Sequence, residues 1–265
     1  MIEVIKLKEV ERFTYIMNYV KEVHCLFKKS AEVFENSFSE GIVKDLYQFE
    51  RPDILIPTSS ANILLEYFQF DSSNRNKRSS TQKEEEAHFD RLVKNKFNNP
   101  PEKGVLITKH EFKTPASIIQ YEKNLNDITI SHINKYNDYM ENYRSNRDSL
   151  NEIEFYSDKI EFGLIIESTS LLPDIVQSEN GNHYLLTPFH FKSFRDILRK
   201  HPFVEHVFYI SGNGNSSYTV YYLYNSNLSD ETYNEVFSIS KNDRLIGFTP
   251  IGLSGVMRIP DKLTK

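Results

Sequence analysis

The stretch that decides the expected fold is residues 50–71, which read ERPDILIPTSSANILLEYFQFD. Apolar runs rich in Ile, Leu and aromatic residues, bounded by Pro and Ser, predict two strands at 53–57 and 61–70. A Thr-Ser-Ser triplet supplies the turn between them. Asp53 opens the first strand and Glu66 lies in the middle of the second. In an antiparallel hairpin these two carboxylates come within reach of one metal ion.

Composition restricts the class of protein around this hairpin. The 265 residues suffice for one large domain or two modest ones. A net charge of −5 excludes a generally basic nucleic-acid binder and confines any such surface to a local patch. Cys25 is the single cysteine, which excludes an internal disulfide and fits a reducing cytosol. With neither a signal peptide nor a long apolar run in the sequence, we expect a cytoplasmic protein without a membrane span.

Strands and helices alternate along the chain, which predicts an α/β or α+β fold with a mixed β-sheet flanked by helices. We expect residues 1–150 to contain a helical N-terminal layer, the hairpin and a long helix or helix pair. Residues 151–265 continue the same unit or form a second subdomain. The predicted helices cover residues 7–38, 84–97, 117–147, 191–200 and 230–239. The predicted strands beyond the hairpin cover residues 104–114, 152–156, 160–168, 204–210 and 218–224.

The hairpin also carries a recognisable pattern: Pro52–Asp53, twelve residues, then Glu66–Tyr67–Phe68. It resembles the PD-(D/E)XK nuclease superfamily, which has an Asp on one strand and an acidic-x-Lys triplet on the next. The resemblance implies a restriction-endonuclease-like core in which Asp53 and Glu66 bind Mg²⁺ or Mn²⁺ for phosphodiester hydrolysis. Phe68 replaces the lysine, so the alternative is a catalytically inactive module that binds DNA or protein.

A second match lies further along the chain. Glu111–Phe112–Lys113 is an intact acidic-x-Lys triplet on a predicted strand, and Gln120 and Tyr121 follow it. This is similar to the RecB-like branch of the superfamily, in which a Gln and a Tyr after the triplet face the nucleic acid. Strand alternation places Glu111 and Lys113 on one face.

These two matches leave three arrangements open. The site is the hairpin pair alone, the second triplet alone, or a composite of both. In the composite, Asp53 and Glu66 bind the metal, Glu111 adds a ligand, and Lys113 takes the role that Phe68 leaves vacant. Ordinary charges at strand edges are the alternative to all three.

Two basic segments are candidate phosphate contacts. Arg75, Lys77 and Arg78 lie in the polar segment 72–83, which we expect to be a loop. Arg195 and Arg199 are four residues apart on a predicted helix and therefore share a face. A solvated loop and a solvated helix face are the alternatives.

Glu167 is the other unusual carboxylate because it lies on the apolar strand GLIIES. An ionised acid there is costly unless it is paired, bound to metal or exposed at the strand end.

Taken together, the sequence favours a cytoplasmic, Mg²⁺- or Mn²⁺-dependent DNA endonuclease. Many Asn, Lys and Ile residues and the absence of Trp are typical of AT-rich genomes, which fits a bacterial or mobile-element defence system against phage. DNA is the expected partner. A homodimer formed through residues 117–147, or a partner subunit of a defence system, is a further expectation.

Overall fold

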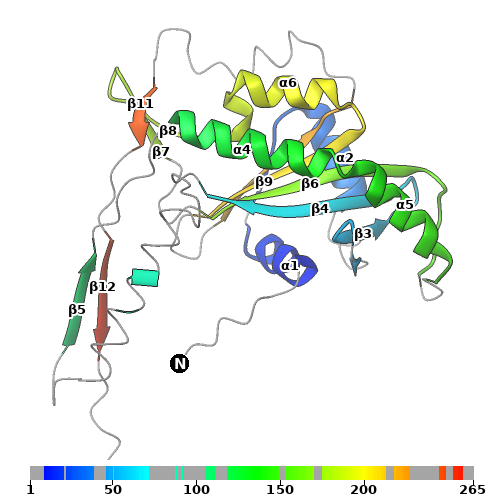
Figure 1. Ribbon diagram of the computed structural model, residues 1–265, viewed down its shortest axis with the longest axis horizontal. Coiled ribbons are helices and arrows are strands. Elements are labelled where there is room, and N and C mark those ends of the chain that lie inside the picture. The colour runs from blue at the N-terminus through cyan, green and yellow to red at the C-terminus, as the bar shows by residue number, and fades with distance from the viewer. Residues whose placement is uncertain are drawn as a thin grey trace, which may run out of the picture.

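The computed structural model describes residues 9–20, 22–38, 46–49, 51–71, 87–88, 91, 105–110, 118–149, 153–169, 175–212, 218–226, 245–248 and 253–258. Within these ranges a mixed seven-stranded sheet has helices on both faces (Figure 1). This confirms the α/β fold with a mixed sheet that the sequence predicts.

Three apolar strands form the centre of the sheet: β4 (Asn62–Phe70), β6 (Ile160–Ser168) and β9 (Val204–Gly212). They run parallel to one another. Their side chains are buried on both faces because helices cover both, and strands of that kind read as continuous apolar runs.

Antiparallel strands extend the sheet on both sides. The strand order is β1-β10-β9-β6-β4-β3-β2, and β3 and β2 follow β4 as antiparallel neighbours. On the other side β10 pairs antiparallel with β9, and β1 pairs parallel with β10. The bounds of these strands are β1 (Val23–Cys25), β2 (Tyr47–Gln48), β3 (Ile54–Pro57) and β10 (Tyr218–Tyr224).

The predicted hairpin is confirmed to within one residue at each strand. The turn closes through Thr58, whose N–H donates to the carbonyl of Ala61 at 2.9 Å. The Thr58 hydroxyl bonds to the same carbonyl at 2.8 Å and accepts the Ala61 N–H at 3.0 Å. A threonine side chain thus fixes the register of the two strands that carry Asp53 and Glu66.

Two helical layers cover the sheet. The helices α4, α5 and α6 pack on one face and α1 lies on the other (Figure 1). The helix α2 packs on the same face as α1, because residues of both belong to one apolar cluster. The pair α4 and α5 also provides the crossover that the parallel strands β4 and β6 require. The helices are α1 (Glu9–Tyr19), α2 (Lys28–Phe38), α4 (Ile118–Ile133), α5 (Tyr136–Asn146) and α6 (Lys192–Lys200), with 3-10 helices η2 (Arg147–Ser149) and η3 (Pro188–His190).

Two smaller sheets complete the described structure. The strands β11, β7 and β8 form one, and β12 pairs antiparallel with β5 in the other. The turn at 178–182 joins β7 to β8 through Gly181, whose φ of +80° favours glycine. The strands are β5 (Val105–His110), β7 (Ile175–Ser178), β8 (His183–Leu185), β11 (Leu245–Phe248) and β12 (Leu253–Arg258).

The alternation along β4 divides the core and orients the site. Leu64 and Phe68 belong to the apolar cluster beneath α4, α5 and α6. Ile63 and Leu65 belong to the cluster beneath α1 and α2. Glu66 has the parity of Leu64, so it projects toward α4 and α5.

Two of the predicted elements are wrong. The helix expected over 7–38 is two helices separated by β1, where Val23 pairs with Val220 of β10. The apolar spacing of this segment suits a helix face. Residues 23–25 instead form a strand because they hydrogen-bond to the edge of β10. The strand expected at 152–156 is absent from its described part, 153–156, which has no regular structure.

The remaining predicted elements lie where they were expected or outside the described residues. The helix pair over 117–147 and the helix over 191–200 are confirmed. Of the helix at 84–97, residues 87–88 and 91 are described and helical, and the helix at 230–239 lies outside the described residues. The seven-stranded sheet takes strands from both 1–150 and 151–265. The described helices include none that is long and apolar enough to cross a membrane.

Candidate functional site

The two carboxyl groups predicted to share a site lie opposite each other on the β3–β4 hairpin. Asp53 directly precedes β3, and the register pairs Ile54 with Leu65. Continuing that register by one residue places Asp53 across from Glu66. The two side chains are close enough for Glu66 to raise the pKa of Asp53. The structure therefore brings together the two acids predicted to meet.

Two side chains from the helical layer hold the carboxylate of Glu66. Nδ1 of His132, in α4, lies 2.8 Å from Oε1. The Tyr139 hydroxyl, in α5, donates to the same oxygen at 2.6 Å. Glu66 is 6% exposed, so these bonds offset the cost of burying its polar atoms. Oε2 takes part in neither bond.

An aromatic stack occupies the position two residues after Glu66. Phe68 projects to the same face of β4, and its ring centroid lies 4.4 Å from that of His132, with the ring planes 12° apart. The stack keeps the imidazole beside the Glu66 carboxylate. It also fills the place in which the family resemblance puts a lysine.

Backbone and side-chain bonds anchor Asp53 at the start of β3. The N–H of Tyr67 donates to Oδ2 of Asp53 at 2.8 Å. The Asp53 carbonyl accepts from the N–H of Phe49 at 2.8 Å and from Nε2 of Gln48 at 3.1 Å. Gln48 also donates to Glu9, at the start of α1, at 3.2 Å. Asp53 is therefore fixed by α1, the β2–β3 connection and β4 together.

The environment of the pair favours the protonated form of Asp53. Burial, followed by the charge of Glu66, raises the pKa of Asp53 to about 7. The Tyr67 N–H lowers that pKa, and the Glu9 charge raises it further. Burial also raises the pKa of the Tyr139 hydroxyl, and its bond to Glu66 adds to the rise. A carboxyl group that is raised to a pKa near neutral by a neighbouring acid is a place where a cation can replace the proton.

The donor set fits a hard divalent cation that keeps several water ligands. Mg²⁺ is commonly bound through one or two carboxylates rather than by an all-protein cage, and Asp53 and Glu66 supply two. Among the described side chains, no group of three or more His, Cys, Asp and Glu residues is placed to hold a metal ion. The pair thus fits partly hydrated Mg²⁺ or Mn²⁺ and does not fit a closed protein site.

Four side chains of the site were not found from the sequence: Glu9, Gln48, His132 and Tyr139. His132 and Tyr139 are seven residues apart, a spacing that places side chains on one side of a helical segment. That spacing is a usable signal once the segment is assigned to the face of the sheet that carries Glu66. Glu9 and Gln48 carry no local signal, because they reach Asp53 only through the packing of α1 and β2.

Glu167 belongs to a second cluster on the opposite face of the sheet. It forms an ion pair with Arg12 of α1, accepts a hydrogen bond from the Tyr67 hydroxyl, and accepts another from Nε2 of Gln69 at 2.9 Å. Glu167 is 2% exposed, so strand-end exposure does not explain it and pairing does. The cluster attaches α1 to the carboxyl ends of β4 and β6.

A third cluster of buried polar groups lies on the neighbouring strands β6, β9 and β10, near the start of β6. His206 lies 2.8 Å from Glu161 through Nε2 and 2.8 Å from the Tyr222 hydroxyl through Nδ1. Burial would raise the pKa of Glu161, but its bonds from His206 and Lys159 lower it to about 2. His206 has no exposed surface, so this cluster has a structural role.

Five of the predicted site residues lie outside the described residues: Glu111, Lys113, Arg75, Lys77 and Arg78. The composite site and the basic loop therefore stay predictions. The residues that follow the second triplet are described. Gln120 donates to Asn124 at 2.7 Å. Tyr121 is fully buried and bonds to the Tyr209 hydroxyl at 2.8 Å, so it does not face a nucleic acid as the resemblance implied.

The predicted basic face of α6 is only partly at the surface. Arg195 is 8% exposed, and its Nη1 donates to the carbonyls of Phe189 and His190 at 2.8 and 3.0 Å. Arg195 therefore stabilises the 3-10 helix η3 before α6. The prediction that Arg195 contacts a phosphate is wrong. Arg199 is half-buried and pairs with Asp196 at 3.3 Å.

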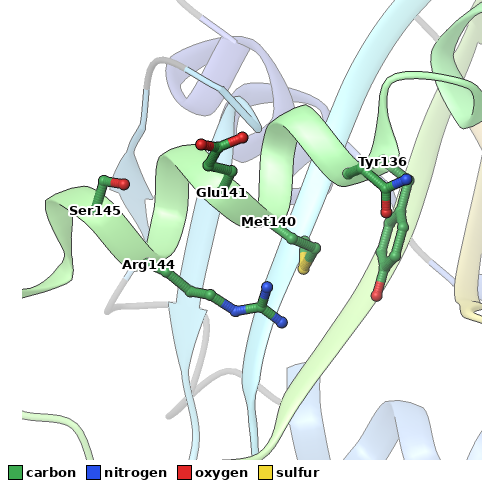
Figure 2. Close-up of a pocket in the computed structure, with 6 residues that line it drawn as sticks. Tyr136, Met140, Glu141, Arg144 and Ser145 are labelled. Carbon is green, nitrogen blue, oxygen red and sulfur yellow. The ribbon is translucent and has the colours of Figure 1, made fainter.

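A pocket of about 350 Å³ runs along α5 (Figure 2). Arg144 and Met140 extend to one side of the helix, and Glu141 extends to the other (Figure 2). The same helix sends Tyr139 to Glu66. The pocket is lined by Tyr136, Asn137, Met140, Glu141, Arg144 and Ser145.

No protein-family model, curated protein or solved structure matches the chain.

Proposed function

We propose that this protein is a divalent-cation-dependent phosphodiesterase that cleaves DNA. The observation that carries the proposal is the carboxyl pair Asp53 and Glu66, which lie across from each other on an antiparallel hairpin, where burial and the charge of Glu66 raise the pKa of Asp53. Two acids in contact repel each other when both are ionised. A cation bound between them removes that repulsion, so cation binding would explain why two acids are placed side by side.

The bound cation supplies Lewis acidity and lowers the pKa of a coordinated water. The protein's own part is to fix the two oxygen donors. Tyr139 and His132 orient Glu66 through Oε1, and the Tyr67 N–H orients Asp53 through Oδ2. Fixed donors of this kind are typical of metal sites in which outer hydrogen bonds set the orientation of the ligands.

The remaining roles follow the composite arrangement. Glu111 adds a ligand, and Lys113 supplies the stabilising positive charge that Phe68 lacks. The DNA phosphates are contacted by Arg75, Lys77 and Arg78. The half-buried Arg199 adds a further contact. Arg195 is excluded from this set because its guanidinium is buried against two carbonyls.

The test measures cation binding and DNA cleavage with isosteric variants. Asp53→Asn and Glu66→Gln remove one charge each, and Asp127→Asn is the control because Asp127 is an exposed acid of α4. We expect calorimetry to detect Mg²⁺ or Mn²⁺ binding to the wild type and to Asp127→Asn, and at least tenfold weaker binding to the two site variants. Cleavage of single- and double-stranded DNA should fall by a factor of a hundred or more in the site variants alone. The proposal is contradicted by equal cleavage by all four proteins, or by a cation affinity that is the same in the wild type, Asp53→Asn and Glu66→Gln.

A second candidate function is a non-catalytic module that binds DNA or a partner protein. The observation in its favour is the stack of Phe68 on His132, which closes the site where a lysine is expected. Such a module has no need of the cation. Binding of DNA without cleavage, together with the absence of Mg²⁺ and Mn²⁺ binding to the wild type, would select it over the nuclease.

A further inference from the structure

The pocket along α5 plays no part in the proposed nuclease site, and its size suits a small molecule. Its volume of about 350 Å³ lies at the lower end of the range for ligand pockets. Tyr136, Met140 and Arg144 are spaced four residues apart and lie on one side of the helix (Figure 2). Because a helix rises about 1.5 Å per residue, the stripe that they form is roughly 12 Å long. The pocket therefore has two ends, one at the ring of Tyr136 and one at the guanidinium of Arg144.

One end of the pocket is apolar and preformed. Met140 is buried in the apolar cluster beneath α4, α5 and α6. The ring of Tyr136 packs against the same cluster, with its centroid 4.1 Å from that of Phe203 and 5.2 Å from that of Phe162. These contacts hold the Tyr136 ring in place before any ligand arrives. A ligand that enters the pocket therefore meets a fixed apolar surface.

The other end of the pocket carries an uncommitted positive charge. Among the described residues, the guanidinium of Arg144 forms neither a hydrogen bond nor an ion pair. By contrast, Arg147 lies three residues further along and pairs with Asp158 at 2.8 Å. Arg144 is also exposed. An incoming ligand can therefore reach the guanidinium without breaking an existing contact.

The acid in the pocket does not neutralise Arg144. Glu141 lies three residues before Arg144, a spacing at which opposite charges can pair on a helix. Figure 2 shows the two side chains on opposite sides of α5, and no ion pair joins them in the part of the chain that the structure describes. The side of the pocket that holds Tyr136, Met140 and Arg144 is therefore apolar at one end and positively charged at the other.

We propose that the pocket along α5 binds a small organic anion that carries an aromatic ring. The planar guanidinium of Arg144 matches two oxygens of a carboxylate or a phosphate. The ring lies over Met140, whose thioether makes favourable contacts with aromatic groups, and beside Tyr136. This binding site is independent of the proposed nuclease function, because it uses none of the residues assigned to the cation or to DNA.

Calorimetry on the full chain tests the proposal with two pairs of probes. Phenyl phosphate and benzoate carry a ring and an anionic group, whereas inorganic phosphate and acetate are the matching anions without the ring. We expect at least one ring-bearing anion to bind the wild type with a Kd below roughly 1 mM. It should bind about tenfold or more tightly than its ringless counterpart, because the pocket buries the apolar surface of the ring. The tighter of the two ring-bearing probes identifies the anionic group of the ligand as a phosphate or a carboxylate.

Three variants show whether the anion binds at Arg144. Arg144→Gln should weaken the binding of the ring-bearing anion about tenfold or more, because a hydrogen bond between two charged groups is lost. Glu141→Gln, on the opposite side of α5, and Lys123→Gln, at an exposed position of α4, should stay within about threefold of the wild type. The probe should also raise the Tm of the wild type and leave that of Arg144→Gln almost unchanged. The proposal is overturned if no ring-bearing probe binds, if the ringless anions bind as tightly, or if Arg144→Gln loses no more affinity than Glu141→Gln.

Discussion

Replacing Asp53 with Asn should stabilise the protein at alkaline pH, although it removes a proposed metal ligand. Asn has the shape of Asp, and its carbonyl oxygen can still accept the Tyr67 N–H that now reaches Oδ2 at 2.8 Å. The substitution removes the negative charge that burial and Glu66 disfavour. Residues at functional sites commonly carry such a cost in stability.

The magnitude follows from the pKa of Asp53, which burial and the Glu66 charge raise from 3.8 to about 7. Each pH unit of displacement corresponds to about 1.4 kcal/mol, which gives an upper limit of roughly 4 kcal/mol. Asp53 is only partly buried, so solvent screening reduces the expected effect to about 1–2 kcal/mol. For a domain of this size that is a change in Tm of roughly 2–8 °C.

The sign is set by proton uptake on folding. Because the folded pKa of Asp53 exceeds the unfolded one, folded protein binds more protons than unfolded protein between about pH 4 and pH 7. The wild type therefore loses stability across that window as pH rises. Asp53→Asn does not titrate there, so its advantage should grow by about 1–2 kcal/mol from pH 5 to pH 8.

Urea unfolding at pH 5 and at pH 8, without divalent cations, measures the effect, with Asp127→Asn as the control for loss of an exposed acid. The reasoning is refuted if the difference in free energy of unfolding between wild type and Asp53→Asn stays constant with pH or becomes smaller toward pH 8. At pH 8, added Mg²⁺ should raise the Tm of the wild type, since the cation takes the place of the missing proton, and should leave Asp53→Asn almost unchanged. Equal stabilisation of both proteins would place the cation elsewhere.

Two further predictions concern the scaffold of the site. Gly163→Ala should destabilise the protein by about 3 kcal/mol or more, because a Cβ would lie 2.5 Å from the backbone oxygen of His206 and 2.8 Å from Leu65. Gly181→Ala is the comparison: its Cβ meets nothing within 4 Å, and its positive φ costs about 1–2 kcal/mol. Thermal unfolding ranks the two, and equal losses would contradict the clash. Glu167→Gln should cost about 1–2 kcal/mol because it removes the buried charge that pairs with the half-buried Arg12; a loss no larger than that of Asp127→Asn in urea unfolding would show that the pair is unimportant.

The hairpin was predictable because all its signals are local. Pro and Ser bound the apolar runs, strand periodicity gives the direction of each side chain, and the twelve residues between Asp53 and Glu66 fix their register through a short turn. The parallel strands around β4 were predictable for the same reason, since strands buried on both faces are continuous apolar runs.

What the sequence did not reveal depends on contacts between distant segments. The strand β1 forms because Val23 meets Val220 on the edge of β10, and its apolar spacing alone suits a helix. The four-residue spacing of Arg195 and Arg199 is typical of an exposed helix face. Arg195 is nevertheless buried because its guanidinium donates to the carbonyls of Phe189 and His190. Tyr121 fits a surface motif by position in the chain, but its hydroxyl is bonded in the core to Tyr209. Periodicity identifies faces of elements and does not identify which neighbour covers them.

Tyr67 connects the two faces of the sheet at the candidate site. Its N–H holds Asp53 on the α4–α5 side, while its hydroxyl bonds to Glu167 on the α1 side. The same helix α1 that presents Arg12 to Glu167 places Glu9 near Asp53 through Gln48. The carboxyl pair is therefore braced from both sides, by α5 through Tyr139 and by α1 through Tyr67 and Gln48. Because both sets of contacts end on the oxygens proposed to bind the cation or on the backbone that carries them, we expect a change in how α1 packs to alter the distance between the two acids and, with it, the proposed cation affinity.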